Sequence, residues 1–151
     1  MNEMIATMGL LEDSWNTLLN GSLSYQGKAV KVYNPDAPED LDPSATVSEH
    51  YVIVRAESEA EVSNKKTYAM NSVVVVDIVT IFQNNINRKV AEDIYGQIVG
   101  LVFSKPGRNR LSEQTGIQIT EVKVEGTFYR DEVGDQKIRR KIVRFSHRIS
   151  S

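Results

Sequence analysis

Residues Met70–Phe82, MNSVVVVDIVTIF, decide how this chain folds, because they predict a strand that is apolar on both sides. Alternate side chains of a strand point to opposite faces. One face carries Val74, Val76, Ile78 and Phe82. The other carries Val73, Val75, Val79 and Ile81, with Asp77 among them. Both faces must therefore be covered, one by the helix that follows and the other by a second layer or a neighbouring subunit. We expect Asp77 to be hydrogen-bonded within the sheet rather than functional.

The elements on either side of this strand are predicted from their spacing. Residues 51–56, YVIVRA, predict an earlier strand, and the polar residues 57–69 predict the exposed tip of a long hairpin. Asn84-Asn85 ends the apolar strand, and residues 86–103 then have the spacing of an amphipathic helix. Its expected inner face comprises Val90, Ala91, Ile94, Ile98, Leu101 and Val102.

The N-terminal part of the chain begins with a second predicted helix, residues 2–19, which Asn20-Gly21 ends. Its apolar stripe forms part of the core or faces a partner, in which case Trp15 is the natural anchor. Residues 28–33 predict a short strand. Residues 34–48, with three Pro and four acids, predict a long exposed loop. Three of those acids, Asp36, Asp40 and Asp42, lack the glycine and distal glutamate of a calcium loop.

The last part of the chain, residues 117–150, predicts a β-hairpin in which the apolar pattern changes phase twice. In the first strand the apolar positions change from odd (Ile117, Ile119) to even (Val122, Val124, Phe128). In the second they change from even (Ile138, Ile142) to odd (Val143, Phe145, Ile149). Each change predicts a β-bulge, a sharp bend, or a switch in which face is covered.

Composition limits the class of protein. The chain has 151 residues, enough for one domain (1–151), and no Cys, which excludes disulfides and thiolate zinc sites. No apolar run is long enough for a membrane span, and Glu3 stands where a signal peptide carries a basic residue, so we expect a soluble intracellular protein. Residues 1–103 carry 7 Lys/Arg and 14 Asp/Glu, a net −7. Residues 104–151 carry 11 and 6, a net +5.

The sequence offers little for catalysis, and we expect neither an enzyme nor a cofactor. His50 and His147 are the only histidines, and neither has a neighbouring Ser or Asp pattern that suggests a triad. The stretch from Gly21 to Lys28 resembles a phosphate-binding loop only superficially. It has five residues between its glycines, lacks the Ser/Thr after the lysine and follows a helix instead of a strand.

The strongest chemical feature is a basic final strand. Its cations are Lys137, Arg139, Arg140, Lys141, Arg144 and Arg148. Three interpretations stay open: a subunit interface, a solvated protective edge, or a nucleic-acid contact. In the interface interpretation these cations meet acids of a neighbouring subunit, with Asp77, Glu57, Glu59 and Glu61 as candidates. A further basic loop contains Lys105, Arg108 and Arg110, which we predict to face DNA or a docking partner.

Three stretches together resemble the tail terminator and tail-completion proteins of tailed bacteriophages. Residues 51–82, YVIVRAESEAEVSNKKTYAMNSVVVVDIVTIF, resemble that family's long hairpin. Residues 86–103, INRKVAEDIYGQIVGLVF, resemble its sheet-packing helix, and residues 137–150, KIRRKIVRFSHRIS, are similar to its last strand. The acidic, proline-rich stretch 34–48 departs from the family's pattern.

The resemblance implies an α+β fold with a mostly antiparallel sheet, a long hairpin, an N-terminal helix and one sheet-packing helix. It also implies a virion structural protein that is made in the host cytoplasm and forms a hexameric or larger ring at the head–tail junction. Such a ring joins the tail or tail hub to the connector, and genomic DNA passes through its lumen without sequence-specific recognition. The alternative is a small nucleic-acid-binding module that uses the basic strand.

Overall fold

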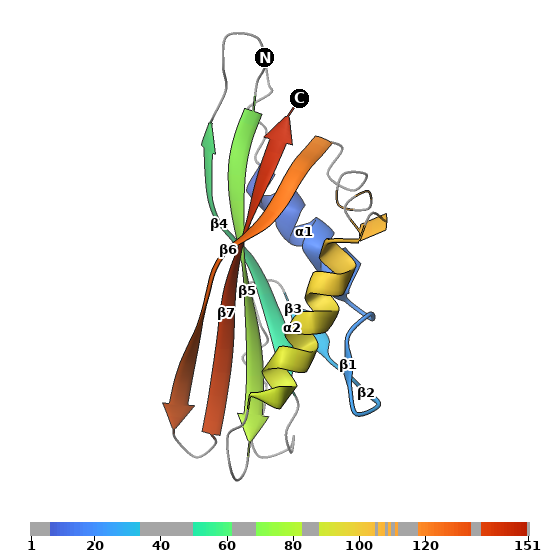
Figure 1. Cartoon of the computed structure of the whole chain (residues 1–151), viewed down its shortest axis with the longest axis vertical. Coiled ribbons are helices and arrows are strands. Elements are labelled where there is room, and N and C mark those ends of the chain that lie inside the picture. Colours follow the sequence, from blue (N-terminus) through green and yellow to red (C-terminus); the bar gives the residue numbers. More distant parts are fainter. Residues whose placement is uncertain are drawn as a thin grey trace.

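Five strands form one twisted sheet in the order β3-β4-β5-β7-β6, with β5 at its centre (Figure 1). The computed structural model describes residues 7–33, 50–61, 69–82, 88–104, 106–107, 109, 111, 118–133 and 137–150. The strands are β3 (Lys31–Tyr33), β4 (Tyr51–Glu61), β5 (Ala69–Phe82), β6 (Gln118–Val133) and β7 (Lys137–Ser150). All neighbours pair antiparallel except β3 and β4, which are parallel. The chain therefore has the predicted α+β fold with a mostly antiparallel sheet.

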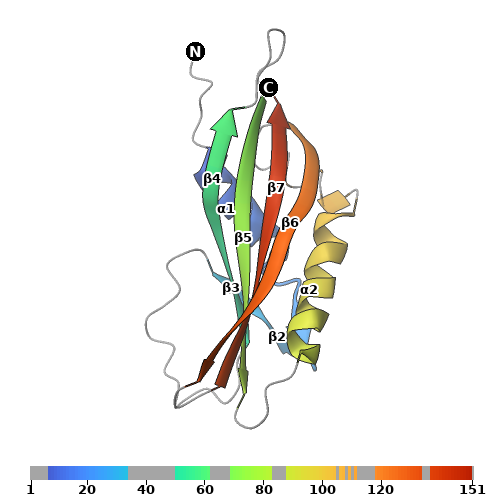
Figure 2. The same cartoon turned by 60° about the vertical axis from the view of Figure 1, so that its left-hand side comes forward.

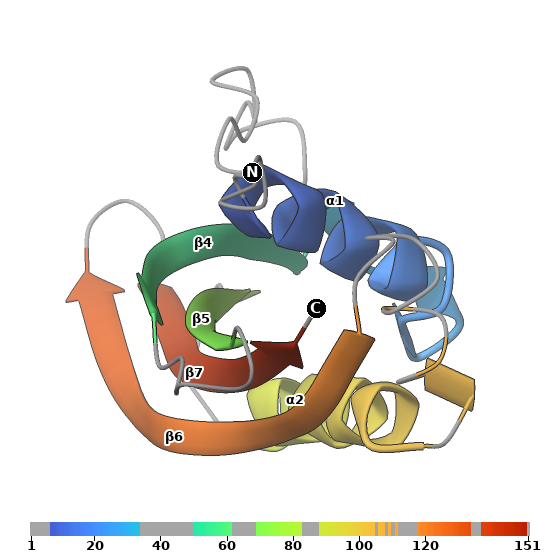
Figure 3. The ribbon, with the colours of Figure 1, turned by 90° about the horizontal axis from the view of Figure 1, so that it is seen from above.

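Both helices, α1 (Thr7–Leu19) and α2 (Lys89–Val102), lie on the same side of the sheet (Figure 3). We call this side the helix face and the opposite side the open face. The core lies between the helices and the helix face. It includes Leu11, Trp15 and Leu19 of α1, Ile94 and Ile98 of α2, and Val52, Val54, Val74, Val76, Ile78, Val143 and Phe145 of the sheet. Both helices thus pack through the apolar stripes that their sequences predict.

The strand β5 is buried on both faces, as its sequence predicts, although no described helix covers the open face. Val75 and Val79 point to the open face and are buried. In the sheet register Val79 lies between Tyr51 of β4 and Arg140 of β7. The strands are strongly twisted across one another (Figure 2). Long side chains on neighbouring strands, such as those of Tyr51 and Arg140, can cover apolar surface beside them. The predicted second layer is not present among the described residues.

Two predicted elements differ from the structure in their extent. The strand predicted over 28–33 is divided, because Lys28–Ala29 is β2, which pairs with β1 (Ser24–Tyr25) in a separate small hairpin. Gln26 and Gly27 have φ of 51° and 79°, the left-handed conformations that a two-residue hairpin turn of this class needs. The expected hairpin tip 57–69 is also shorter, since β4 continues to Glu61 and β5 starts at Ala69.

Bulges explain most of the irregularities in the sequence pattern. One bulge at Glu57 lets β4 continue into its polar end. Two more lie in β6, at Thr120 and Glu125, whereas β7 pairs with β5 without a register shift. The first bulge in β6 confirms the predicted change from odd to even positions. The second, which was not predicted, reverses it, so Phe128 lies on the open face. In β7 the apolar pattern changes because both of its faces are partly buried.

Candidate functional site

The basic strand β7 forms ion pairs with acids of the same chain. On the open face, Arg140 donates from Nη1 to Asp77 Oδ2 at 2.7 Å, and its Nε lies 3.2 Å from Glu132 Oε1. Burial raises the pKa of Asp77, while the nearby Arg140 opposes that rise. The other carboxylate oxygen, Oδ1, is buried and has no hydrogen-bond partner among the described residues. Asp77 is therefore bonded within the sheet, as expected, but only through one oxygen.

A second open-face pair joins β7 to β4. Arg144 donates to both carboxylate oxygens of Glu57, from Nε at 2.7 Å and from Nη2 at 3.0 Å. This two-point contact lowers the pKa of Glu57 through the hydrogen bonds from Arg144. Glu57 is the extra residue of the bulge in β4, which turns its side chain toward β7. The guanidinium of Arg144 also lies 5.9 Å from the ring centre of Phe128.

On the helix face, Lys141 links β7 to α2. Its Nζ donates to Glu92 Oε1 at 2.6 Å and to the hydroxyl of Tyr129 at 3.2 Å. That hydroxyl in turn donates to Glu92, and Nζ lies 4.5 Å from the ring centre of Tyr95. Lys141 is only 5% exposed. The hydrogen bonds from Lys141 and Tyr129 lower the pKa of Glu92. These contacts join α2 to β6 and β7 of the sheet.

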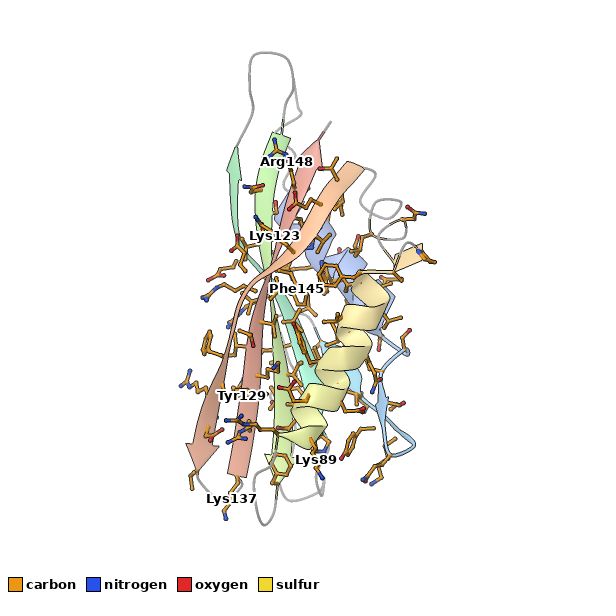
Figure 4. All side chains as sticks on the ribbon, in the orientation of Figure 1. Lys89, Lys123, Tyr129, Lys137, Phe145 and Arg148 are labelled. Carbon is orange, nitrogen blue, oxygen red and sulfur yellow. The ribbon has the colours of Figure 1, made fainter. Side chains whose placement is uncertain are left out.

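The remaining cations of β7 differ in how they are used. Arg139 forms a two-point contact with Asp131 across the β6–β7 hairpin, at 2.9 and 3.0 Å. Lys137 and Arg148 lie at opposite ends of the molecule (Figure 4), and within the described residues no ion pair joins either of them. Arg139, Arg140, Lys141 and Arg144 thus form ion pairs within the chain.

The other predicted interface residues are only partly placed. The backbones of Glu59 and Glu61 lie in β4 opposite Ser72 and Met70, and their side chains lie outside the described residues. The loop residues Lys105, Arg108 and Arg110 lie outside the described residues as well, as does the acidic segment 34–48.

Neither histidine has the surroundings of a catalytic group. His147 is fully buried, accepts a hydrogen bond from the indole of Trp15 at Nε2, and has Nδ1 3.0 Å from the carbonyl of Ser72. His50 accepts the backbone N–H of Ile81 at Nδ1, and its ring contacts Tyr25 and Phe82. Burial lowers the pKa of both imidazoles, to about 4 for His147. Within the part of the chain that the structure describes, no group of three His, Asp or Glu could hold a metal ion.

One hollow lies on the open face. It has a volume of about 290 Å³ and is lined by Ile53, Arg55, Asp77, Arg130, Glu132, Arg140 and Ile142. A smaller hollow of about 100 Å³ lies near the other end of β7 and is lined by Asn71, Glu121, Lys123, Glu125, Ser146 and Arg148. Both are lined mainly by charged and polar side chains, whereas small-molecule sites are mostly apolar. Neither hollow therefore has the lining that is typical of a small-molecule site.

Comparisons with known proteins identify a shared fold. No family model matches the sequence, and no curated protein matches it significantly. Among solved structures, a chain described as "Virion of native gene transfer agent (GTA) particle" has a TM-score of 0.59 and 13% sequence identity to this chain. The likeness covers 98% of each chain. At this identity the likeness establishes the fold alone. None of the described helices is long and apolar enough to cross a lipid bilayer.

Sequence reasoning named Asp77 and Glu57 as partners of the basic strand, although in a neighbouring subunit, and missed Asp131 and Glu92, which also pair with β7. The contact of Asp131 with Arg139 could have been found from the hairpin register. Asp131 stands directly opposite Arg139 in a hairpin whose turn is centred on residue 135. The signal for Glu92 and Tyr95 was weaker: they are three residues apart on α2 and so share a side of that helix. Nothing in the sequence alone places this side next to Lys141, since that contact depends on how α2 crosses the sheet.

Proposed function

We propose that this chain is a structural protein of a virion, without enzymatic activity, that forms a closed ring at the head–tail junction. The ring joins the tail or tail hub to the connector, and genomic DNA passes through its lumen. The observation that carries this proposal is the likeness to a chain of a gene transfer agent virion, which extends over 98% of both chains. A likeness of this extent includes both helices and the whole sheet rather than one motif.

The distribution of charge along the chain is compatible with assembly from identical copies, although three acids of the first part, Asp77, Glu57 and Glu92, are already paired with bases of the second part within one copy. Residues 1–103 have a net charge of −7 and residues 104–151 a net charge of +5. Copies that meet head to tail place unlike surfaces against each other, and a rotation that closes produces a ring. Opposite charges on those surfaces favour this arrangement over contacts between like surfaces.

The mass of the purified chain in solution tests the proposal. Light scattering over a concentration series, with negative-stain images of the largest species, is expected to show closed rings. If the chain is monomeric alone, it is expected to assemble when mixed with tail or connector proteins encoded nearby in the same genome. A chain that stays monomeric under both conditions contradicts the proposal.

The alternative function, nucleic-acid binding through β7, has less support because Arg139, Arg140, Lys141 and Arg144 are already paired with acids. Cations that are neutralised within the chain release fewer counterions from a phosphate backbone. Salt-titrated DNA binding by the wild type and by the double variant Arg140→Glu/Arg144→Glu separates the two functions. Strong binding that depends on salt and is lost in the variant would favour the alternative.

A further inference from the structure

A buried carboxylate lines the open-face hollow of about 290 Å³ without its full set of hydrogen bonds. The side chain of Asp77 is 7% exposed, and its Oδ2 accepts from Nη1 of Arg140 at 2.7 Å. The second oxygen, Oδ1, is buried and has no hydrogen-bond partner among the described residues. An ionised carboxylate accepts at both oxygens, and a buried acceptor that is left unpaired is unfavourable. A donor that reaches Oδ1 through the hollow would therefore be held there.

The cross-strand neighbours of Asp77 cannot supply this donor from their side chains. In the sheet register Asp77 lies between Ile53 of β4 and Ile142 of β7, and all three residues line the hollow. The two isoleucines have no polar side-chain atoms and place apolar surface on either side of the carboxylate. This surface suits the methylene groups of an incoming side chain whose polar tip meets Oδ1.

An unsatisfied donor lines the same hollow. Nε of Arg140 is buried and makes no hydrogen bond within the part of the chain that the structure describes, although it lies 3.2 Å from Oε1 of Glu132. At that distance the missing bond reflects the direction of the N–H, which does not point at the oxygen. Nε of Arg140 and Oδ1 of Asp77 are each two covalent bonds from an atom of the 2.7 Å contact between these side chains. One small group can therefore reach both.

The charges around the hollow favour a neutral group that has both a donor and an acceptor. The lining contains three cations, Arg55, Arg130 and Arg140, and two acids, Asp77 and Glu132, a net charge of +1. An incoming ammonium or guanidinium would add a cation and no acceptor. An incoming carboxylate would place another acceptor against Oδ1. A primary carboxamide carries N–H donors and a carbonyl acceptor at one tip, whereas the N–H and C=O of a trans peptide point in opposite directions.

We propose that the open-face hollow binds the side chain of an Asn or Gln from a partner protein. Its amide N–H donates to Oδ1 of Asp77, its carbonyl accepts from Nε of Arg140, and its methylene groups lie between Ile53 and Ile142. A small molecule is a poorer occupant, because small-molecule sites are mostly apolar and five of the seven lining residues here are charged. The site is additional to the contacts that would close a ring, and it does not depend on the proposed function.

Binding of blocked amino acids to the full chain tests the proposal. N-acetylglutamine methylamide is compared with the methionine and glutamate derivatives, which share its backbone, by saturation-transfer difference NMR, a measurement suited to a monomer or a ring. The glutamine probe is expected to bind saturably. The methionine probe is expected to bind about tenfold more weakly, because its thioether has no proton to donate to Oδ1 of Asp77, and the glutamate probe is expected to bind more weakly as well. Equal binding of all three probes would overturn the proposal.

Asp77→Asn locates the binding. In this variant the side-chain oxygen still accepts from Nη1 of Arg140, an amino group replaces Oδ1, and the net charge of the lining rises from +1 to +2. Two donors then face the hollow, so the glutamate probe is expected to bind more tightly than the glutamine probe. Asp93→Asn makes the same chemical change on the exposed side of α2 and is expected to keep the wild-type order. An unchanged order in Asp77→Asn, or a reversed order in Asp93→Asn, would overturn the site.

The source of the carboxamide is tested with free glutamine. It is expected to bind no more tightly than the blocked glutamine probe, and much tighter binding would reassign the hollow to a metabolite and overturn the partner protein. Saturable binding by none of the probes would also overturn the proposal and leave Oδ1 of Asp77 to an ordered water only. None of these outcomes bears on the ring, which light scattering measures separately.

Discussion

Trp15 of α1 donates its indole N–H to Nε2 of His147 in β7 across 2.8 Å, in the fully buried centre of the protein. The same imidazole has Nδ1 3.0 Å from the carbonyl of Ser72 in β5. Because Nε2 accepts, Nδ1 carries the proton and donates to that carbonyl. One neutral histidine therefore joins a helix and the two central strands, and the ring of Phe145 packs against the indole at 4.8 Å.

Acid is expected to weaken the fold through His147. Burial lowers the pKa of His147 from 6.5 to about 4, so between these pH values the unfolded chain binds a proton that the folded chain does not. Stability is full above pH 6.5 and is lost as the pH falls toward 4, at up to about 1.4 kcal/mol per pH unit from this group. Urea unfolding of a His50→Gln variant at several pH values measures the slope. Adding His147→Gln is expected to remove the contribution of His147 to the slope of stability against pH. An unchanged slope would contradict this role of His147.

Removal of the indole donor is expected to destabilise the protein. Trp15→Phe keeps most of the ring but leaves Nε2 of His147 buried without its donor, which costs about 1–3 kcal/mol. Urea unfolding followed by circular dichroism measures the loss, since this variant removes the one tryptophan of the chain. Trp15→Phe combined with His147→Leu is expected to recover only part of the loss, because it removes the unpaired Nε2 but also removes the donor to the carbonyl of Ser72. Equal stability of Trp15→Phe and wild type would contradict the role of the bond.

Substitution of Glu92 is expected to lower the stability of the protein more than substitution of its partner Lys141. The side chain of Lys141 is 6% exposed and that of Glu92 is 48% exposed. Glu92→Gln leaves a buried ammonium without its carboxylate, at a cost of about 1–2 kcal/mol, whereas Lys141→Met removes the buried charge and is expected to change stability by less than about 1 kcal/mol. Thermal or urea unfolding of both variants at neutral pH provides the comparison. A larger loss for Lys141→Met would reverse the assignment.

Two glycines in α2 are expected to be replaceable in the isolated chain. Gly96 and Gly100 lie one turn apart, and a Cβ added at either would meet no atom within 4 Å beyond its chain neighbours and the backbone of its own helix. Alanine at each position is expected to stabilise the helix by about 0.5–1 kcal/mol, because glycine loses more backbone freedom on folding. Unfolding measurements on each variant test this, with Gly107→Ala as a control that should destabilise, since its Cβ would meet the carbonyl of Leu101.

The elements that the sequence predicts well are those with a regular spacing of apolar residues. The apolar stripes of α1 and α2 and the two-sided burial of β5 follow from the spacing of residues such as Trp15, Ile94 and Val76, and the structure confirms them. The division of residues 28–33 was not predictable from composition. It depends on the left-handed turn at Gln26-Gly27, and glutamine is an unusual residue for that conformation.

The location of the candidate site on the last strand was predictable from the sequence, but the ion pairs that its basic residues form were not. The basic residues of β7 were identified from the sequence. In the register, Arg140, Arg144 and Arg148 lie on one face, and Lys137, Arg139 and Lys141 lie on the other. Their pairing with Asp77, Glu57 and Glu92 depends on strand order and on how α2 crosses the sheet, which single-sequence patterns do not encode. The second bulge, at Glu125, was hidden because Phe128 is apolar yet exposed, so its position in the pattern suggested burial.

The bulges give β6 a tolerance to changes in length. β6 has 16 residues and β7 has 14, and the difference is the pair of extra residues at Thr120 and Glu125. Deleting either residue would straighten the ladder and leave every other side chain on its present face. Deleting Tyr129 instead would exchange buried and exposed positions between that point and the nearest bulge. Two spare residues therefore let this strand shorten during evolution without rebuilding the core.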